Sequence, residues 1–173
     1  HMFGKKTDAK KTVIGFVCPK TKQQVSAYKL CDGKWTPTAE PVTAWFALKL
    51  EPLFLRPKRF NALIGGRGSG KSLGEAGHGL ILMHDKGQNL MCIREFQSSI
   101  ADSVHNLLSE EAKRLELSHL NVTEKALRFA HNKTATKFMG LSRNPESVKS
   151  AFGFSHWFIE EAQFLSDKSL KTL

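Results

Sequence analysis

The segment 65–72 places the tightest constraint on what this chain can fold into. Its sequence, GGRGSGKS, fits the pattern G-x-x-x-x-G-K-[ST]. Glycines at such positions let successive backbone N–H groups turn inward around an anion, and a helix that begins near Lys71 adds the positive end of its dipole. The apolar run FNALIG (60–65) predicts a buried strand before the loop, and residues 71–87 predict a helix after it. The sequence therefore predicts a phosphate-binding loop.

This loop indicates ATP and Mg²⁺ as ligands. Lys71 is expected to reach the β- and γ-phosphates, and the Ser72 hydroxyl to ligate Mg²⁺. A guanidinium at position 67 has two interpretations, since it can stabilise charge on the γ-phosphate or pair with a local acid. The residues expected around the phosphates are Gly65, Gly66, Arg67, Gly68, Ser69, Gly70, Lys71 and Ser72.

A pair of acids follows the run HWFI, at positions 160 and 161. An ATPase of this kind needs an acid at a strand end for the Mg²⁺ shell and a group that polarises the attacking water. We assign Glu160 to Mg²⁺ and Glu161 to the water. The alternative is a helix start, where acids interact favourably with the dipole.

Strand-like and helix-like segments alternate after residue 60, which favours an α/β fold with a largely parallel sheet. The expected helices cover 71–87 and 98–117, and residues 143–153 form a loop with one helical turn. The helix 71–87 contains Gly74, Gly77 and Gly79, which weaken it unless a tightly packed neighbour compensates. The expected strands after the first are 88–93, a hairpin over 120–131, 136–141 and 155–161.

The N-terminal third has a different character. Residues 12–18 and 23–30 predict a β-hairpin, 31–41 are turn-rich, and 42–54 fit either a helix or a strand. The basic stretch 56–59 reads as a linker, so we expect a boundary near 50–58. The predicted organisation is a tag scar and disordered basic tail (1–11), a small β-rich region (12–50) and a phosphate-loop domain (51–173).

The formal net charge of +10 is concentrated at this end, because residues 1–60 hold twelve lysines and arginines against four acids. Such an excess indicates nucleic acid or an acidic partner, and a merely solvated lysine tail is the alternative for residues 4–11. The sequence contains no run of 18 apolar residues, so we expect no membrane span.

The combination of GGRGSGKS, CIREFQSSIADSV (92–104) and HWFIEEA (156–162) resembles the ATPase domain of the terminase large subunit of tailed bacteriophages. The middle segment discriminates best, since few ATPases follow a phosphate loop with a strand ending in Arg-Glu and a helix that opens Gln-Ser-Ser-Ile. The resemblance covers about residues 51–173. It implies a P-loop NTPase fold of the ASCE type, with a mostly parallel sheet flanked by helices.

Site residues carry over from this resemblance position by position. Lys71 and Ser72 match the Walker A positions, while Glu160 and Glu161 match the Walker B acid and the catalytic glutamate. Arg67 matches a loop arginine proposed as a cis arginine finger. The resemblance makes Arg59 and Phe60 candidates for contacting adenine, although a linker charge and a core aromatic explain them equally well. Arg94 either senses the nucleotide or forms a structural salt bridge.

The resemblance also implies a function. Family members are hydrolases and motor proteins that couple ATP hydrolysis to the movement of double-stranded DNA into procapsids. Their partners are the portal protein and the small terminase subunit, and they form a homo-oligomeric ring on the procapsid in the host cytoplasm. Members continue past Walker B into a coupling motif, a lid and a nuclease domain, so we expect residues 51–173 to be a truncated ATPase domain without nuclease activity.

Two alternatives stay open from the sequence. One is a nucleotide- or DNA-binding assembly module with little turnover. The other is a different P-loop ATPase, such as a helicase.

Overall fold

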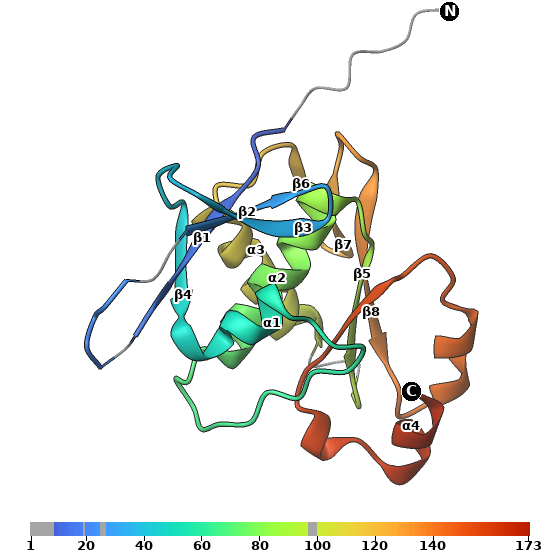
Figure 1. Cartoon of the computed structure of the whole chain (residues 1–173). Coiled ribbons are helices and arrows are strands. Elements are labelled where there is room, and N and C mark those ends of the chain that lie inside the picture. Colours follow the sequence, from blue (N-terminus) through green and yellow to red (C-terminus); the bar gives the residue numbers. More distant parts are fainter. Residues whose placement is uncertain (1–8, 19, 25–26, 97–99) are drawn as a thin grey trace, which may run out of the picture.

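A computed structural model shows a mixed α/β molecule with two sheets and helices between them (Figure 1). It describes residues 9–18, 20–24, 27–96 and 100–173. The greater part of the predicted disordered tail, and the start of the helix predicted over 98–117, lie outside these residues. Lys11 at the end of that tail is held in place, because its Nζ donates to the backbone oxygen of Asp85 at 2.5 Å.

The first sheet is built by residues 13–47 in the order β3-β2-β1-β4. The predicted hairpin is confirmed, since β1 (Val13–Val17) pairs antiparallel with β2 (Ala27–Cys31). The turn-rich stretch 31–41 contains a further strand that was not predicted, β3 (Lys34–Thr38), which pairs antiparallel with β2. Asp32 and Gly33 form the tight turn between them with positive φ, so this Asp-Gly pair marks a hairpin and not a loop.

The ambiguous stretch 42–54 is both strand and helix. It begins as β4 (Ala44–Ala47), which pairs parallel with β1, and continues as a short 3-10 helix η1 (Leu48–Leu50) and α1 (Glu51–Leu55). Pro52 in the first turn of α1 favours this switch, because proline fixes φ at a helical value where its missing N–H is not needed. The chain thereby turns from the first sheet towards the phosphate loop.

The second sheet has the order β6-β7-β8-β5-β9. β5 (Leu90–Arg94) pairs parallel with both β8 (Thr134–Gly140) and β9 (His156–Ile159), whereas β6 (Leu120–Thr123) and β7 (Ala126–Phe129) form the predicted hairpin. β7 continues antiparallel to β8. The predicted largely parallel sheet is therefore corrected to a mixed one.

The buried strand predicted over FNALIG was wrong. Residues 61–66 form no helix or strand, and the side chain of Ile64 is 96% exposed. A strand requires a hydrogen-bonded neighbour, and the sheet ends at β9, whose second edge carries no ladder within the part of the chain that the structure describes. The apolar composition of this segment predicted burial, but composition does not supply a partner strand.

The helix after the phosphate loop, α2 (Lys71–Lys86), lies in the middle of the molecule (Figure 1). Gly87 ends it in the left-handed conformation, as predicted. The three internal glycines have the expected tight neighbours. A Cβ would lie 2.5 Å from Leu50 at Gly74, 2.7 Å from Phe46 at Gly77 and 3.1 Å from Leu90 at Gly79. Contacts this short show that α2 packs closely against both sheets.

One continuous cluster of buried side chains connects the two sheets through α2. It contains Phe16 and Phe46 of the first sheet, Phe54 of α1, Leu80 of α2 and Phe158 of β9. The core therefore continues across the boundary predicted near residues 50–58.

The remaining elements cover the second sheet. α3 (Ile100–Arg114) packs on α2, and its Arg114 pairs with the buried Glu111 and lies over the Phe46 ring at 4.7 Å. The predicted helical turn is the 3-10 helix η3 (Pro145–Ser150), which is followed after β9 by η4 (Ala162–Phe164) and α4 (Asp167–Thr172). Among the described residues, no helix has the length and apolar character that crossing a membrane requires.

Candidate functional site

The predicted phosphate loop is an exposed turn that leads directly into α2. Gly68 and Gly70 have φ of 70° and 79°, a conformation that residues with a Cβ rarely adopt. A Cβ at Gly66, Gly68 or Gly70 would meet no atom within 4 Å, so the space around the loop is open. The loop backbone thus has room for a ligand beside the N-terminus of α2, where unpaired N–H groups favour an anion.

Lys71 folds back over this loop. Its Nζ donates to the Gly65 carbonyl, to the Gly66 carbonyl at 3.1 Å and to the Ser69 hydroxyl at 3.0 Å. The ammonium group therefore holds the loop closed through the loop's own oxygens. An incoming phosphate would have to replace these acceptors, and an ionised phosphate is the stronger acceptor for an ammonium group.

The two predicted acids follow β9, as expected. The Glu160 N–H donates to the Ile93 carbonyl at 3.0 Å and so extends the β5–β9 pairing by one bond, and Glu161 then turns the chain with a φ of 54°. Because Glu161 has left the strand, the two side chains are not forced to opposite faces of a sheet.

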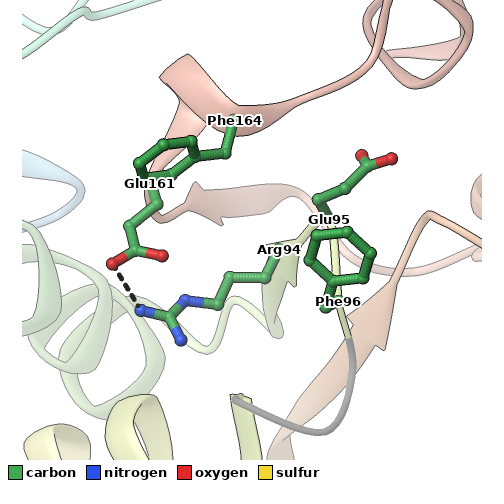
Figure 2. Close-up of a pocket in the computed structure, with 5 residues that line it drawn as sticks. All are labelled: Arg94, Glu95, Phe96, Glu161 and Phe164. Carbon is green, nitrogen blue, oxygen red and sulfur yellow. Dashed lines mark ion pairs between the residues drawn. The ribbon is translucent and has the colours of Figure 1, made fainter.

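Arg94, at the end of β5, binds both acids. Its Nε lies 3.0 Å from Glu160 Oε2, and a terminal nitrogen lies 3.0 Å from Glu161 Oε1. Figure 2 shows the second ion pair, with the exposed rings of Phe96 and Phe164 beside it in a small pocket of about 280 Å³. The sequence left two roles open for Arg94, nucleotide sensing and a structural salt bridge. The structure shows the salt bridge, which joins Glu160 and Glu161.

A groove of about 1490 Å³ brings the loop and the acids together. Gly65, Lys71 and Ser72 of the loop line it, and so do Glu160 and Glu161. The loop and the acid pair are far apart in sequence, but both line this one groove.

Of the other predicted site residues, some line the groove and some do not. Arg59 and Phe60 also line the groove, and the Arg59 guanidinium lies 5.3 Å from the centre of the Phe60 ring, which is 77% exposed. Arg67 is exposed on the loop and does not line the groove, and within the described residues it makes no ion pair. The remaining loop residues, Gly66, Gly68, Ser69 and Gly70, lie in the turn itself.

Sequence reasoning missed a third acid in the groove, Glu75. Burial raises the pKa of Glu75 to about 7, and the charge of nearby Glu160 acts in the same direction. Burial likewise raises the pKa of Glu160, against the opposing effect of Arg94. Glu75 lies three residues after Ser72 on the same helix face, so the helical period could have revealed it.

The donor set in the groove suits Mg²⁺. A serine hydroxyl and carboxylates are hard oxygen ligands, which this ion prefers. Glu160 Oε2 is buried and lies 3.0 Å from Arg94 Nε, so a bound cation would have to compete with this guanidinium for the carboxylate. Ser72, Glu160 and Glu75 are donors of this type, but the described residues contain no group of three or more acids, histidines or cysteines placed to hold a metal ion.

Deeper in the groove, His78 of α2 contacts His156 of β9, with ring centres 5.2 Å apart. His78 is 3% exposed, and its Nδ1 has no hydrogen-bond partner among the residues that the structure describes. Burial lowers the pKa of His78 to about 3, helped by the charges of His156 and Lys86, and burial lowers the pKa of His156 to about 4.

We expect acid to destabilise the fold through His78. At a pH above 6.5, the ordinary pKa of histidine, the ring is neutral in both the folded and the unfolded protein. Below pH 6.5 the ring takes up a proton in the unfolded chain but stays neutral in the folded protein, where its pKa is about 3. The free energy of unfolding then falls by up to about 1.4 kcal/mol per pH unit as the pH drops towards 3. Urea unfolding at pH 7.5, 6 and 5 should show a shallower fall in His78→Phe than in the parent. The exposed His119→Asn should behave like the parent, and equal slopes in all three proteins would refute this account.

A family model described as phage terminase large subunit matches residues 57–173. Because this match covers more than half of the chain, the chain belongs to that family, and the resemblance drawn from the three motifs is confirmed. Membership associates the chain with phage DNA packaging. Residues 1–56 lie outside the match. No curated protein matches the chain.

Proposed function

We propose that this chain binds Mg²⁺-ATP in the groove beside α2 and hydrolyses it to drive double-stranded DNA into a procapsid. The observation that carries the proposal is the groove itself, which unites Lys71 and Ser72 of the loop with Glu160 and Glu161 after β9. A P-loop ATPase needs these two groups of residues to face one another.

Each residue has a distinct task in this proposal. The loop N–H groups and the N-terminus of α2 bind the phosphates, and Lys71 exchanges the Gly65 and Gly66 carbonyls for phosphate oxygens. Ser72 and Glu160 would hold Mg²⁺, with Glu75 close to Glu160 as further negative charge. When bound, Mg²⁺ neutralises charge that develops on the phosphates.

Glu161 is the proposed group that orients the attacking water. Its side chain is 48% exposed, so water reaches it, and its ion pair with Arg94 fixes one of its oxygens. Because Arg94 also binds Glu160, a change at either carboxylate alters the contacts of the other. Arg67 would act as a cis arginine finger only after its exposed side chain turns into the groove. Arg59 and Phe60, on the groove wall, are proposed to contact adenine.

The partners follow from the family. We propose that the chain acts on DNA together with the portal protein and the small terminase subunit, as a ring of copies on the procapsid in the host cytoplasm.

One observation favours a second function, a binding module with little turnover. Residues 61–66 lie outside the sheet, so the loop is supported by α2 but by no strand before it. A loop held at one end only is less well positioned for catalysis than one held at both.

Phosphate release by this chain from ATP, measured with and without Mg²⁺ and with and without double-stranded DNA, separates the two functions. The motor proposal predicts turnover that requires Mg²⁺ and increases with DNA. Mg²⁺-ATP binding without any phosphate release would instead support the binding module.

A further inference from the structure

The groove is longer than a bound nucleotide needs. Residues of α2 line it from the first turn to the last, and from Ser72 onward they recur at intervals of three or four: Lys71, Ser72, Glu75, His78, Leu82 and Lys86. At a rise of 1.5 Å per residue, Lys71 and Lys86 are separated by about 22 Å along the helix axis. The volume of the groove, about 1490 Å³, also exceeds the roughly 300–1,000 Å³ of ordinary small-molecule pockets.

The two ends of the groove differ in charge. Beside the phosphate loop the groove has a mixed lining, with the acids Glu75, Glu160 and Glu161 and the cations Lys58, Arg59 and Lys71. The other end is lined by Lys86 of α2 and Lys34 of β3, both exposed, and neither forms an ion pair within the described ranges of the chain.

The β2–β3 turn joins these two lysines. A Cβ at Gly33 would lie 3.4 Å from Lys86 Cε and 3.9 Å from its Nζ, so the Lys86 side chain packs against the turn that immediately precedes Lys34. Asp32 in the same turn makes no ion pair among the described residues, so the local charge of the two lysines is not neutralised by a direct contact. Two adjacent cations without such a contact form a site for an anion with more than one charge.

The wall beside Lys34 also presents an aromatic side chain. Trp35 is half-buried, lines the groove and rests edge-on against Phe54 at 5.8 Å between ring centres. Lysine charges beside an aromatic ring are the combination with which proteins bind the phosphates and bases of nucleic acid strands. Residues 34 and 35 lie outside the family match, so the additional N-terminal sheet supplies this part of the groove.

We infer that the Lys34–Lys86 end of the groove binds the phosphate backbone of a nucleic acid. This contact is separate from the proposed ATP site, because the two ends lie about 22 Å apart along α2. The inference goes beyond ATP hydrolysis, since it gives the chain a surface for its polymer substrate.

The test is the salt dependence of binding to a fluorescently labelled 20-nucleotide single strand and to a 20-base-pair duplex, followed by anisotropy. Each lost phosphate contact lowers the slope of log K against log salt by about 0.9 for duplex and 0.7 for single strand. The Lys34→Gln/Lys86→Gln variant removes two such contacts and should therefore lose about 1.8 units of slope if the groove binds the duplex, or about 1.4 if it binds the single strand. The probe that shows this loss identifies the preferred form of nucleic acid.

A matched control removes two exposed lysines from distant turns, Lys20→Gln/Lys125→Gln, with the same change in net charge. Its slope should equal that of the parent. An unchanged slope in the groove variant, or an equal loss of slope in the control, overturns the inference.

The affinity for Mg²⁺-ATP, measured in the same proteins, should be equal in the parent and in both variants. If the slope changes as expected but no protein binds ATP, only the ATPase proposal is refuted.

Discussion

Lys71→Ala removes Mg²⁺-ATP binding, with an expected loss of roughly 30- to 5,000-fold in affinity, the equivalent of about 2–5 kcal/mol. The reason is that the ammonium is the positive side chain that the loop itself directs, through Gly65, Gly66 and Ser69, to the place where phosphates would lie. Isothermal titration of the variant with Mg²⁺-ATP checks the prediction.

The matched control is Lys125→Ala, which removes an exposed lysine from the β6–β7 turn. It should bind as the parent does, and both variants should keep the parent's melting temperature, because neither lysine is buried in the core. Parental affinity in Lys71→Ala would show that residues 65–72 are not a phosphate site.

Glu161→Gln should lower turnover by about 10²–10⁴-fold while Mg²⁺-ATP affinity stays within a few fold. Glutamine keeps the shape of the side chain but cannot accept a proton from the attacking water. The ion pair with Arg94 is lost, but its cost in stability is small because the side chain is 48% exposed. Single-turnover phosphate release, measured at saturating ATP, separates the chemical step from binding.

Glu146→Gln provides the comparison for this variant, since Glu146 also forms an exposed ion pair, with Lys149, away from the groove. It should hydrolyse ATP at the parental rate. Turnover retained in Glu161→Gln would transfer the water-orienting role to another carboxylate of the groove, with Glu75 as the first candidate.

The elements that the sequence predicted well carry their own local signals. The helix 71–87 was bounded by a glycine at its end, and the hairpins were marked by alternating apolar residues around short polar turns. The strand before Glu160 was recognisable from four largely apolar residues that end in acids. In each of these cases the residues that decide the structure lie within a few positions of one another.

One failure was local, since the missed strand β3 pairs with its neighbour β2 across the Asp32-Gly33 turn. The other failures concern partners from distant parts of the chain. FNALIG has the composition of a buried strand, but a strand forms only where another edge accepts its hydrogen bonds, and composition does not reveal that edge. The groove shows the same limit. The motifs predicted Lys71, Ser72, Glu160 and Glu161, whereas the joining of both acids by Arg94 depends on the parallel register of β5 and β9.

The three glycines of α2 have a mechanical consequence. Leu50, Phe46 and Leu90 approach the helix backbone where no side chain keeps them away, so each acts as a stop against sliding along the helix axis. Sliding of α2 past these three side chains is therefore sterically opposed. A displacement that a ligand causes at Lys71 would then be transmitted to Phe46 of β4 and Leu90 of β5, and through them to both sheets.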